Sequence, residues 1–453
     1  MSTREFDIIV LGAGNSADVP RIAAAAGMRV ALVEKGPLGG TCPNRGCIPS
    51  KLLLAHAEAA NAVRNAHRFH VDAQLNGVDP DRILKDVMEY TDRFDDILEE
   101  DLHENVTLFR GHGAFEGDRT VRVGDDVLTA PKVVIATGSR PRRPDLGAPY
   151  WTSDEMFLAE RAPKSIVIVG GGYIATELAT FFQGVGIDTR LIVRHGKLLG
   201  AEDDEVRGVF TEGFTAHVPV SFFTEIVDAG YEEGVFHLKL RGAGGYEGEC
   251  RTEALLYAIG RVPNADRIGL ENTSIATNDR GFIAVNDSLE TNVDGVYALG
   301  DVTGRHMFTH AASFEAVYLG EVLTGKRSGP LDYGPMPHAV FTDPEVAGVG
   351  ATEQQLKADG VDYVAAAAPY SSATKGRAIK ERHGLVKFML DRGGKILGCH
   401  IVGAQASVLL HEVIAAMKWR NHISSITEMI HIHPSLPEIV KGAARKAAAA
   451  LDA

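Results

Sequence analysis

The 453-residue sequence has few cysteines, no excess of positive charge and no long apolar run. Four cysteines are too few for a disulfide-stabilised secreted scaffold, and this usage indicates a cytoplasmic protein, in which a disulfide is more often catalytic than structural. The 46 basic and 60 acidic side chains give a formal net charge of −14, which argues against nucleic acid or an anionic membrane as a partner. The sequence contains no apolar stretch of transmembrane length and no signal-peptide pattern.

Two of the four cysteines, Cys42 and Cys47, stand together in the segment GGTCPNRGCIPSK at residues 39–51. Glycines before the pair and an apolar run after it predict a helix start, where the helix dipole and a nearby lysine would lower a thiol pKa. The alternative is a structural pair or half of a zinc site. Zinc usually requires closer Cys pairs and a second ligand pair, whereas Cys250 and Cys399 are isolated. We therefore predict a redox-active disulfide and no metal site.

The N-terminal segment has the pattern of a dinucleotide-binding βαβ unit. A predicted buried strand at residues 6–11 leads into a GxGxxA loop and a helix, and a second strand at 29–33 ends in an acid. Glycines allow a pyrophosphate to approach the backbone at the helix N-terminus, and the acid can bind a ribose hydroxyl. This combination favours a nucleotide site over an ordinary glycine turn. The residues expected to bind the first dinucleotide are Gly12, Gly14, Ala17, Glu34 and Lys35.

A second unit of the same kind follows a proline-rich crossing at residues 140–149. It has a strand at 165–169, a GGGYIA loop, a helix and a strand at 189–193. Two such units imply two dinucleotides. The second strand ends in an arginine where an NAD site usually has an acid, and arginine can pair with a 2′-phosphate, so NADPH is favoured over NADH. The expected binding residues are Gly170, Gly172, Tyr173, Ala175 and Arg194, and His195 and Lys197 could share the role of the arginine.

The pattern changes from residue 332 onward. Several predicted strands precede a helix near residues 407–420, which suits an antiparallel sheet with helices on one face. Near the C-terminus, His433 is followed by a proline and, five residues on, by Glu438. Earlier in the chain, residues 81–104 are predicted to form one helix. We interpret its run of acidic residues as a face exposed to solvent.

These motifs resemble those of the pyridine nucleotide-disulfide oxidoreductases, flavoproteins that include glutathione, trypanothione and mycothione reductases and dihydrolipoamide dehydrogenase. The resemblance extends over essentially the whole chain. It implies an α/β fold with two Rossmann-like dinucleotide-binding domains, for FAD and NADPH, and a C-terminal α+β dimerisation domain. The expected division is a first part of the FAD domain at 1–148, an NAD(P)H domain at 149–266, a second part of the FAD or central domain at 267–331, and an interface domain at 332–453.

The resemblance also implies roles for the reactive residues. Cys47 would lie against the flavin as a charge-transfer thiolate, and Cys42 would attack the substrate disulfide. Because thiol–disulfide exchange releases a thiolate, a proton donor is needed. The partner subunit's His433, oriented by Glu438, would supply that proton in a homodimer. His431 is a rival for this role.

Further residues fall in motifs that bind cofactors in the family. Lys51 would lie near the flavin and pair with Glu177, and Tyr173 would cover the nicotinamide pocket. An aromatic residue at that position favours a reductase over a lipoamide dehydrogenase. The other cofactor-binding residues implied by these motifs are Gly40, Thr41, Gly113, Ala136, Thr137, Gly138, Gly260, Arg261, Asp301 and Thr309.

The resulting interpretation is a reductase of a low-molecular-weight disulfide. The GNS at residues 14–16 and the GAQAS at 403–407 look closest to mycothione reductases, whereas Ile22 stands where glutathione reductase has a substrate-binding arginine. The alternatives are an NAD-dependent dihydrolipoamide dehydrogenase and a non-catalytic flavin-binding subunit. Arg194 and Tyr173 argue against the first, and the retained cysteines and His/Glu pair argue against the second. Mercuric and thioredoxin reductases use a further cysteine pair near the C-terminus, which this sequence lacks.

Overall fold

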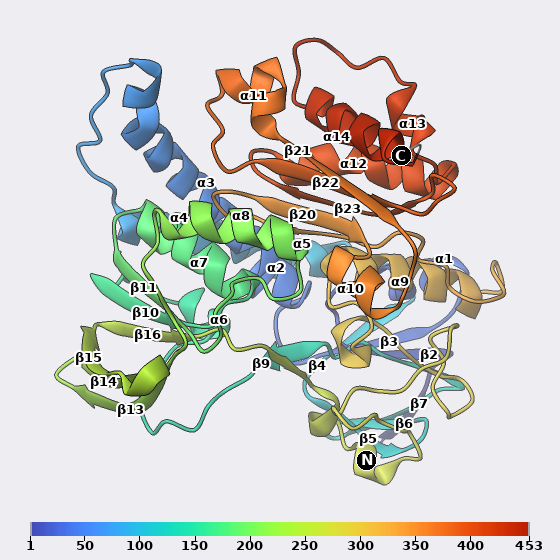
Figure 1. Ribbon diagram of the computed structural model, residues 1–453. Helices are drawn as coiled ribbons and strands as arrows, with labels where there is room; N and C mark the ends of the chain where they lie inside the picture. Colours follow the sequence, from blue (N-terminus) through green and yellow to red (C-terminus); the bar gives the residue numbers. More distant parts are fainter. Residues whose placement is uncertain (1, 452–453) are drawn as a thin grey trace.

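The structure, a computed structural model, describes residues 2–451. Figure 1 shows two sheet units in the lower half of the view and a third sheet, orange to red, above them. The first unit contains a five-stranded parallel sheet. Its strands, in spatial order, are β18 (Val296–Ala298), β8 (Lys132–Ile135), β2 (Ile8–Leu11), β3 (Val30–Glu34) and β4 (Val106–Arg110). The central strand β2 is buried along its whole length, as expected for a parallel strand covered on both faces.

Alternate side chains of β2 contact different layers. Ile8 packs against helices α1 (Asp18–Ala25) and α9 (Thr309–Leu323), whereas Ile9 packs against a small four-stranded sheet on the other face. A period-two burial pattern of this kind follows from the pleat of the strand. In spatial order the small sheet contains β1 (Ser2–Glu5), β7 (Asp126–Thr129), β6 (Thr120–Val123) and β5 (Gly113–Gly117).

The second unit repeats this layering. Its parallel sheet contains β12 (Val220–Phe222), β11 (Asp188–Val193), β10 (Ser165–Val169) and β16 (Ala254–Tyr257). Ile168 packs on the side of α7 (Tyr173–Gly184) and α3 (Cys47–Asn65), and Val167 packs on the side of an antiparallel sheet. That antiparallel sheet contains β13 (Thr224–Glu232), β14 (Val235–Gly242) and β15 (Glu247–Thr252).

The C-terminal unit is a five-stranded antiparallel sheet, which confirms the predicted change of pattern. Its order is β19 (Pro337–Val340), β20 (Val346–Gly350), β23 (Ile396–Val402), β22 (Leu385–Leu390) and β21 (Val364–Pro369). Helices α12 (Ala406–Trp419) and α14 (Pro437–Ala449) form one apolar core with this sheet. Figure 1 shows these two helices above the sheet, and α8 (Asp204–Thr215) of the second unit below it.

Shorter elements connect the units or extend them. They include α2 (Thr41–Arg45), α4 (Pro80–Thr91), α5 (Arg93–Glu100), β9 (Ser139–Pro141), α6 (Ser153–Met156), β17 (Arg261–Pro263), α10 (Glu353–Ala358), α11 (Thr374–Ala378) and α13 (Ser424–Thr427).

One element prediction needs correction. The helix expected at residues 81–104 is two helices, α4 and α5, because the helical segment breaks at Asp92, which caps both of them. Its acidic run is mainly exposed, in agreement with the interpretation as a solvated face, and Asp95 and Glu99 form surface ion pairs with Arg110. Within residues 2–451 we find no helix that combines the length and the apolar character needed to cross a membrane.

A buried ion cluster fastens the C-terminal sheet to the second unit. The side chain of Lys387 on β22 is 2% exposed, and its Nζ lies 3.0 Å from Asp203, 3.1 Å from Glu205 and 2.6 Å from Glu353. Asp203 is fully buried and also caps α8. The hydrogen bonds and charges of the carboxylates outweigh burial and raise the pKa of Lys387. Lys387 therefore stays cationic and compensates a carboxylate that water cannot solvate.

Replacing Lys387 with methionine is expected to destabilise the fold strongly. The substitution leaves Asp203 buried without its cation, and breaking a buried pair in this way costs about 3–5 kcal/mol of unfolding free energy. Chemical denaturation followed by circular dichroism measures this change. Lys239→Met is the matched control, because Lys239 and Asp228 form an ion pair of 2.9 Å on the exposed surface. Equal stability of the two variants would contradict the assigned role.

Candidate functional site

A cavity of about 890 Å³ lies where residues of all three units meet, and both cysteines of the 39–51 segment line it. A second cavity of about 240 Å³ adjoins it, because several residues line both. Of the predicted site residues, the first cavity is lined by Gly14, Thr41, Cys42, Cys47, Lys51, Ala136, Gly138, Gly172, Tyr173, Glu177, Arg261, Asp301 and Thr309. The second is lined by Gly12, Gly14, Glu34, Lys35, Gly40, Thr41, Gly113, Ala136, Thr137 and Gly138. The predicted residues outside both linings are Ala17, Gly170, Ala175, Arg194, Gly260, His433 and Glu438.

A break between α2 and α3 brings the two thiols together. Cys42 lies in α2, Cys47 is the first residue of α3, and the chain turns between the helices at Gly46. A Cβ at Gly46 would lie 3.0 Å from the carbonyl oxygen of Thr41, so a side chain would crowd this turn. Cys47 Sγ lies 3.1 Å from the hydroxyl of Thr309 at the start of α9, and the two thiols are close enough to affect each other's pKa. The sequence placed Thr309 at the cofactor but gave no sign of its contact with sulfur.

The two thiols have opposite pKa shifts. The hydrogen bond from Cys42, together with that from Thr309 and the charge of Lys51, lowers the pKa of Cys47 to about 6, although burial opposes the change. The same thiol–thiol hydrogen bond and burial raise the pKa of Cys42 well above its ordinary value. Near neutral pH the pair therefore holds a thiolate on Cys47 and a proton on Cys42, and only a thiolate is a nucleophile.

Alkylation of Cys47 in the dithiol form is expected to follow this low pKa. As the pH falls, the reactive thiolate should persist until about pH 6. An ordinary thiol with a pKa of 9.0 is already protonated at a much higher pH. Mass spectrometry of the iodoacetamide-labelled protein at a series of pH values measures the midpoint. Lys51→Met should move the midpoint upward, because the substitution removes a cation that favours the thiolate. A midpoint near 9.0 in the unaltered protein would contradict the assignment.

An ion pair stands beside the thiols. Lys51 Nζ lies 2.7 Å from Glu177 Oε2, and the Glu177 side chain is 8% exposed. The other oxygen of Glu177 accepts a hydrogen bond from the backbone N–H of Phe341, whose ring lies under the Lys51 ammonium at 4.4 Å. The predicted pairing of Lys51 and Glu177 is therefore present. The sequence did not single out Phe341, which holds both partners from the C-terminal unit.

The first glycine loop approaches the cysteine segment closely. Gly14 and Gly40 come together so tightly that a Cβ at Gly40 would lie 2.8 Å from Gly14 Cα, and Gly40 has a φ of 63°. Glu34 at the end of β3 accepts hydrogen bonds from the backbone N–H groups of Ala13 and Gly36. The carboxylate is therefore fixed next to the loop and faces the second cavity.

Asp301 lines the first cavity. It lies three residues beyond the end of β18, in a short 3-10 turn. Its Oδ2 accepts a hydrogen bond of 2.5 Å from Ser139, and Ser139 in turn accepts one from Arg261. Ser139 was missed because a serine after a strand has no distinctive sequence signal. Ser139 and Arg261 thus hold one carboxylate oxygen of Asp301, while the other oxygen has no hydrogen bond within residues 2–451.

Comparison with known proteins places this geometry in a family. Residues 6–316 match the model of the pyridine nucleotide-disulphide oxidoreductases, and residues 336–444 match the dimerisation domain of the same proteins. The chain belongs to the pyridine nucleotide-disulphide oxidoreductase family. It is therefore an oxidoreductase, and the family combines FAD with a pyridine nucleotide. The match to the dimerisation domain indicates a homodimer.

Relatives of this chain have two different names. A mycothione reductase of Mycobacterium tuberculosis is 34% identical, with 98% of this chain and 99% of the relative aligned. Dihydrolipoyl dehydrogenases of Cupriavidus necator and Corynebacterium glutamicum are each 33% identical, with 98% of both proteins aligned. Because these identities are nearly equal, they show the family but do not identify the substrate or the preferred nucleotide.

The residues at the first loop fit the FAD of the family. Thr137 Oγ1 is buried without a hydrogen-bond partner and lies at the lining of the second cavity. A buried hydroxyl without a partner is costly unless a ligand satisfies it. The fixed carboxylate of Glu34, the open backbone at Gly14 and this hydroxyl all line the second cavity, so polar groups are distributed along it. The donors and acceptors are those that a dinucleotide with ribose and phosphate groups requires.

The second glycine loop has the expected form, but its residues divide between two environments. Gly170 has a φ of 140°, and a Cβ there would lie 2.4 Å from the carbonyl oxygen of Ala258, so only glycine fits. Ala175 is fully buried behind the loop, whereas Tyr173 is 44% exposed at the first cavity. Arg194 at the end of β11 is exposed and has no ion pair or side-chain hydrogen bond within residues 2–451.

The C-terminal dyad forms, but away from the cysteines of its own chain. His433 Nδ1 lies 2.9 Å from Glu438 Oε1, and the other oxygen of Glu438 accepts the backbone N–H of Ser435. These hydrogen bonds lower the pKa of Glu438. The side chain of the rival, His431, is instead 5% exposed, and its Nε2 lies 3.0 Å from Glu412 Oε2, so this nitrogen already has a partner. The His433 side chain is 70% exposed and is not part of the cavity lining described above.

Proposed function

We propose that the protein is an NADPH-dependent reductase of a low-molecular-weight disulfide, with Cys42 and Cys47 as its redox-active pair. The observation that carries this proposal is the adjacent thiol pair with opposite pKa shifts beside Lys51, inside a cavity that adjoins the one lined by the residues fitted to FAD. Such a pair suits dithiol chemistry, because one sulfur is ready as a thiolate and the other keeps a proton.

The chemistry assigned to the chain's own residues balances as two electrons and two protons. When bound, FAD supplies the two-electron relay between a nicotinamide and a disulfide. In the resulting dithiol, Cys42 passes its proton to the partner subunit's His433 and attacks one sulfur of the substrate. The substrate S–S bond breaks, and the first thiolate leaves and takes up that proton. Cys47 then attacks the Cys42 sulfur of the mixed disulfide, releases the second thiol and closes the Cys42–Cys47 disulfide.

A proton donor for the released thiolate is assigned to the partner subunit's His433. In this proposal Glu438 fixes the ring through Nδ1 and leaves Nε2 to exchange protons with the sulfur. The segment around the dyad supports a position against a second chain, because Ile430 is 100% and Ile432 is 80% exposed. Apolar side chains exposed to this degree are commonly covered by a partner.

The preference for NADPH rests on Arg194. Its guanidinium is exposed and without an ionic partner, whereas nearby Lys197 is paired with Asp204 at 3.2 Å, so Arg194 is the cation left for a 2′-phosphate. We expect Arg194→Ala to lower kcat/KM for NADPH by about 10- to 100-fold, as for the loss of a charged hydrogen bond of roughly 1.5–3 kcal/mol. kcat/KM for NADH, measured in the same assay, should stay unchanged. Lys197→Gln is the matched control, and an equal loss with both nucleotides would contradict the assignment.

A mycothione-type disulfide is the proposed substrate class. The mycothione reductase that matches over nearly the whole chain and the GNS and GAQAS segments support this choice. Dihydrolipoamide oxidation with NAD is the second candidate, because dihydrolipoyl dehydrogenases match equally well. The test is nucleotide turnover by the purified holoenzyme with oxidised glutathione, mycothione, oxidised ergothioneine, lipoamide and cystine. Turnover highest with mycothione and NADPH supports the proposal. Turnover confined to lipoamide with NADH, or to dihydrolipoamide with NAD, overturns it.

A further inference from the structure

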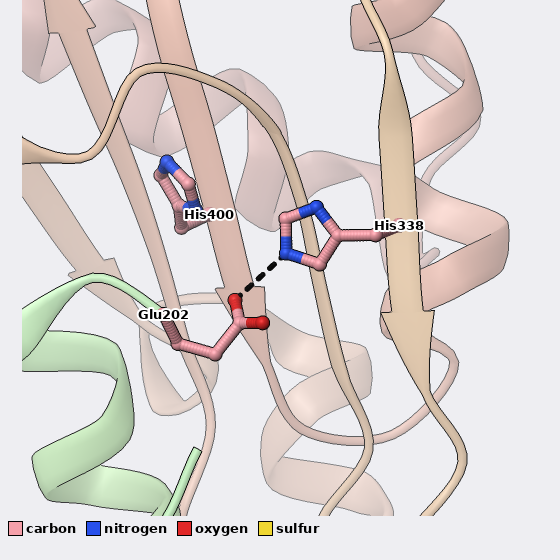
Figure 2. A group of neighbouring side chains, drawn as sticks. All are labelled: Glu202, His338 and His400. Carbon is pink, nitrogen blue, oxygen red and sulfur yellow. Dashed lines mark hydrogen bonds and ion pairs between the residues drawn. The ribbon is translucent and has the colours of Figure 1, made fainter. Parts of the chain in front are cut away.

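Three side chains that the redox chemistry does not use converge between the second unit and the C-terminal sheet. Glu202 precedes α8, His338 lies on β19 and His400 lies on β23, so three distant segments contribute one residue each. Figure 2 shows the ring of His338 and the carboxylate of Glu202 turned toward each other, with the ring of His400 beside them. One potential ligand atom from each residue lies within 4.8 Å of the other two. Glu202 and His400 are buried, and His338 is half-buried.

His400 has an unused nitrogen that faces this cluster. Its Nε2 lies 3.1 Å from the carbonyl oxygen of Ala351, and because a carbonyl can only accept, Nε2 carries the proton. The other nitrogen, Nδ1, is therefore a lone pair. It is buried and has no hydrogen-bond partner, and the residue as a whole is 0% exposed.

His338 directs a nitrogen to the same place. Its Nε2 lies 2.9 Å from Glu202 Oε2, and the Glu202 side chain is 6% exposed. A Cβ built on Gly348 would lie 2.6 Å from His400 Nδ1 and 3.0 Å from His338 Nε2. Both nitrogens therefore border one small space above Gly348, and glycine is the residue that leaves this space open.

We propose that Glu202, His338 and His400 form a binding site for a divalent transition-metal ion of the Zn²⁺ type. Two neutral imidazoles and one carboxylate are a donor set that such ions prefer over Mg²⁺ or Ca²⁺. Metal-bound histidines usually donate their other N–H to a backbone carbonyl, as His400 does to Ala351. Ligand atoms around a tetrahedral Zn²⁺ are roughly 3.3 Å apart for bonds of about 2.0 Å, so the Glu202 and His338 side chains must turn toward His400 Nδ1.

The surroundings of the cluster allow an ion to enter and be held. Glu202 and His338 both line the 890 Å³ cavity, which gives access from solvent and room for a water as the fourth ligand. The neighbouring carboxylate of Asp203 is already compensated by Lys387, so Glu202 is the anionic ligand that remains for the cation. A bound ion would join the segment before α8 to two strands of the C-terminal sheet. It would therefore stabilise the contact between these units.

Titration of the oxidised holoenzyme with ZnCl₂ by isothermal calorimetry tests the proposal. The oxidised form is used because its cysteines are joined as a disulfide and offer no thiolate to the metal. We expect one Zn²⁺ per chain, a rise in the thermal midpoint, and at least a tenfold loss of affinity in both His338→Gln and Glu202→Gln. His237→Gln is the matched control, because His237 is exposed on β14, remote from the cluster, and its loss should change nothing.

Two measurements make the outcome decisive even if one variant folds poorly. X-ray absorption of the zinc-loaded protein should show only nitrogen and oxygen ligands at about 2.0–2.1 Å, whereas a sulfur shell near 2.3 Å would place the ion on cysteine. Zinc binding should also persist in a Cys42→Ser/Cys47→Ser double variant. The proposal is overturned if the holoenzyme binds no zinc, if both cluster variants bind it as the unaltered protein does, or if the double cysteine variant loses it.

Discussion

Cys42→Ser is expected to abolish disulfide reduction, with a loss of kcat on the order of 10³-fold or more, as for removal of a covalent nucleophile. In the proposed sequence Cys42 forms the mixed disulfide, and a serine hydroxyl cannot exchange with sulfur. Reduction of the bound flavin by NADPH should remain, because this step precedes any use of Cys42. Stopped-flow absorbance of the flavin and steady-state NADPH oxidation, measured on the same preparation, separate the two reactions.

Cys250→Ser provides the matched control for this prediction. Cys250 is half-buried on β15 and does not line the cavity, and burial raises its pKa. The variant should therefore keep full turnover. Full disulfide turnover in Cys42→Ser would show that the roles of the cysteines are wrongly assigned, and loss of flavin reduction in the same variant would show that its defect is not specific to thiol exchange.

His433→Gln is expected to lower kcat/KM for the disulfide by about 10²- to 10⁴-fold, the usual contribution of a positioned acid–base group. The half-reaction with NADPH should be unaffected. Glu438→Gln should act in the same direction but less strongly, because it weakens the orientation of the ring without removing it. His431→Gln tests the rival residue. If His431→Gln loses disulfide turnover and His433→Gln keeps it, the assignment is reversed.

Mixed dimers test whether His433 acts across the subunit boundary. A Cys42→Ser chain and a His433→Gln chain are each inactive as homodimers, but a mixed dimer with sites shared between chains contains one intact site. Random reassortment should then restore about one quarter of the unaltered activity, since half of the dimers are mixed and half of their sites are complete. If cysteines and dyad worked within one chain, mixing would restore nothing.

Much of this fold could be predicted because its signals are local. The glycine loops, the apolar strands before them and the acid at Glu34 lie within single βαβ units, so periodicity and spacing indicate them directly. The strand at Ser165–Val169 was predicted to the residue. The ion pair of Lys51 and Glu177 was obtained only through family resemblance, because 126 positions separate the two residues.

The remaining features depend on tertiary packing that one sequence does not encode visibly. The hydroxyl of Thr309 meets Cys47 from 262 positions away, and Ser139 reaches Asp301 from 162. A lysine such as Lys387 normally predicts an exposed position, and only the assembled structure shows why it is buried. The Glu202, His338 and His400 cluster is also invisible in the sequence, because single histidines at unrelated positions indicate no shared site. The predicted limits of the domains and the roles of individual cofactor residues remain predictions.

The most direct test of the central claim follows the cysteines through one reductive half-reaction. The oxidised holoenzyme is mixed anaerobically with a stoichiometric amount of NADPH, then alkylated under denaturing conditions and mapped by mass spectrometry. We predict that Cys42 and Cys47 are joined and unlabelled before NADPH is added, and that both are labelled after it has been consumed. Free, labelled cysteines in the oxidised enzyme, or an intact disulfide after NADPH has been oxidised, would contradict the account.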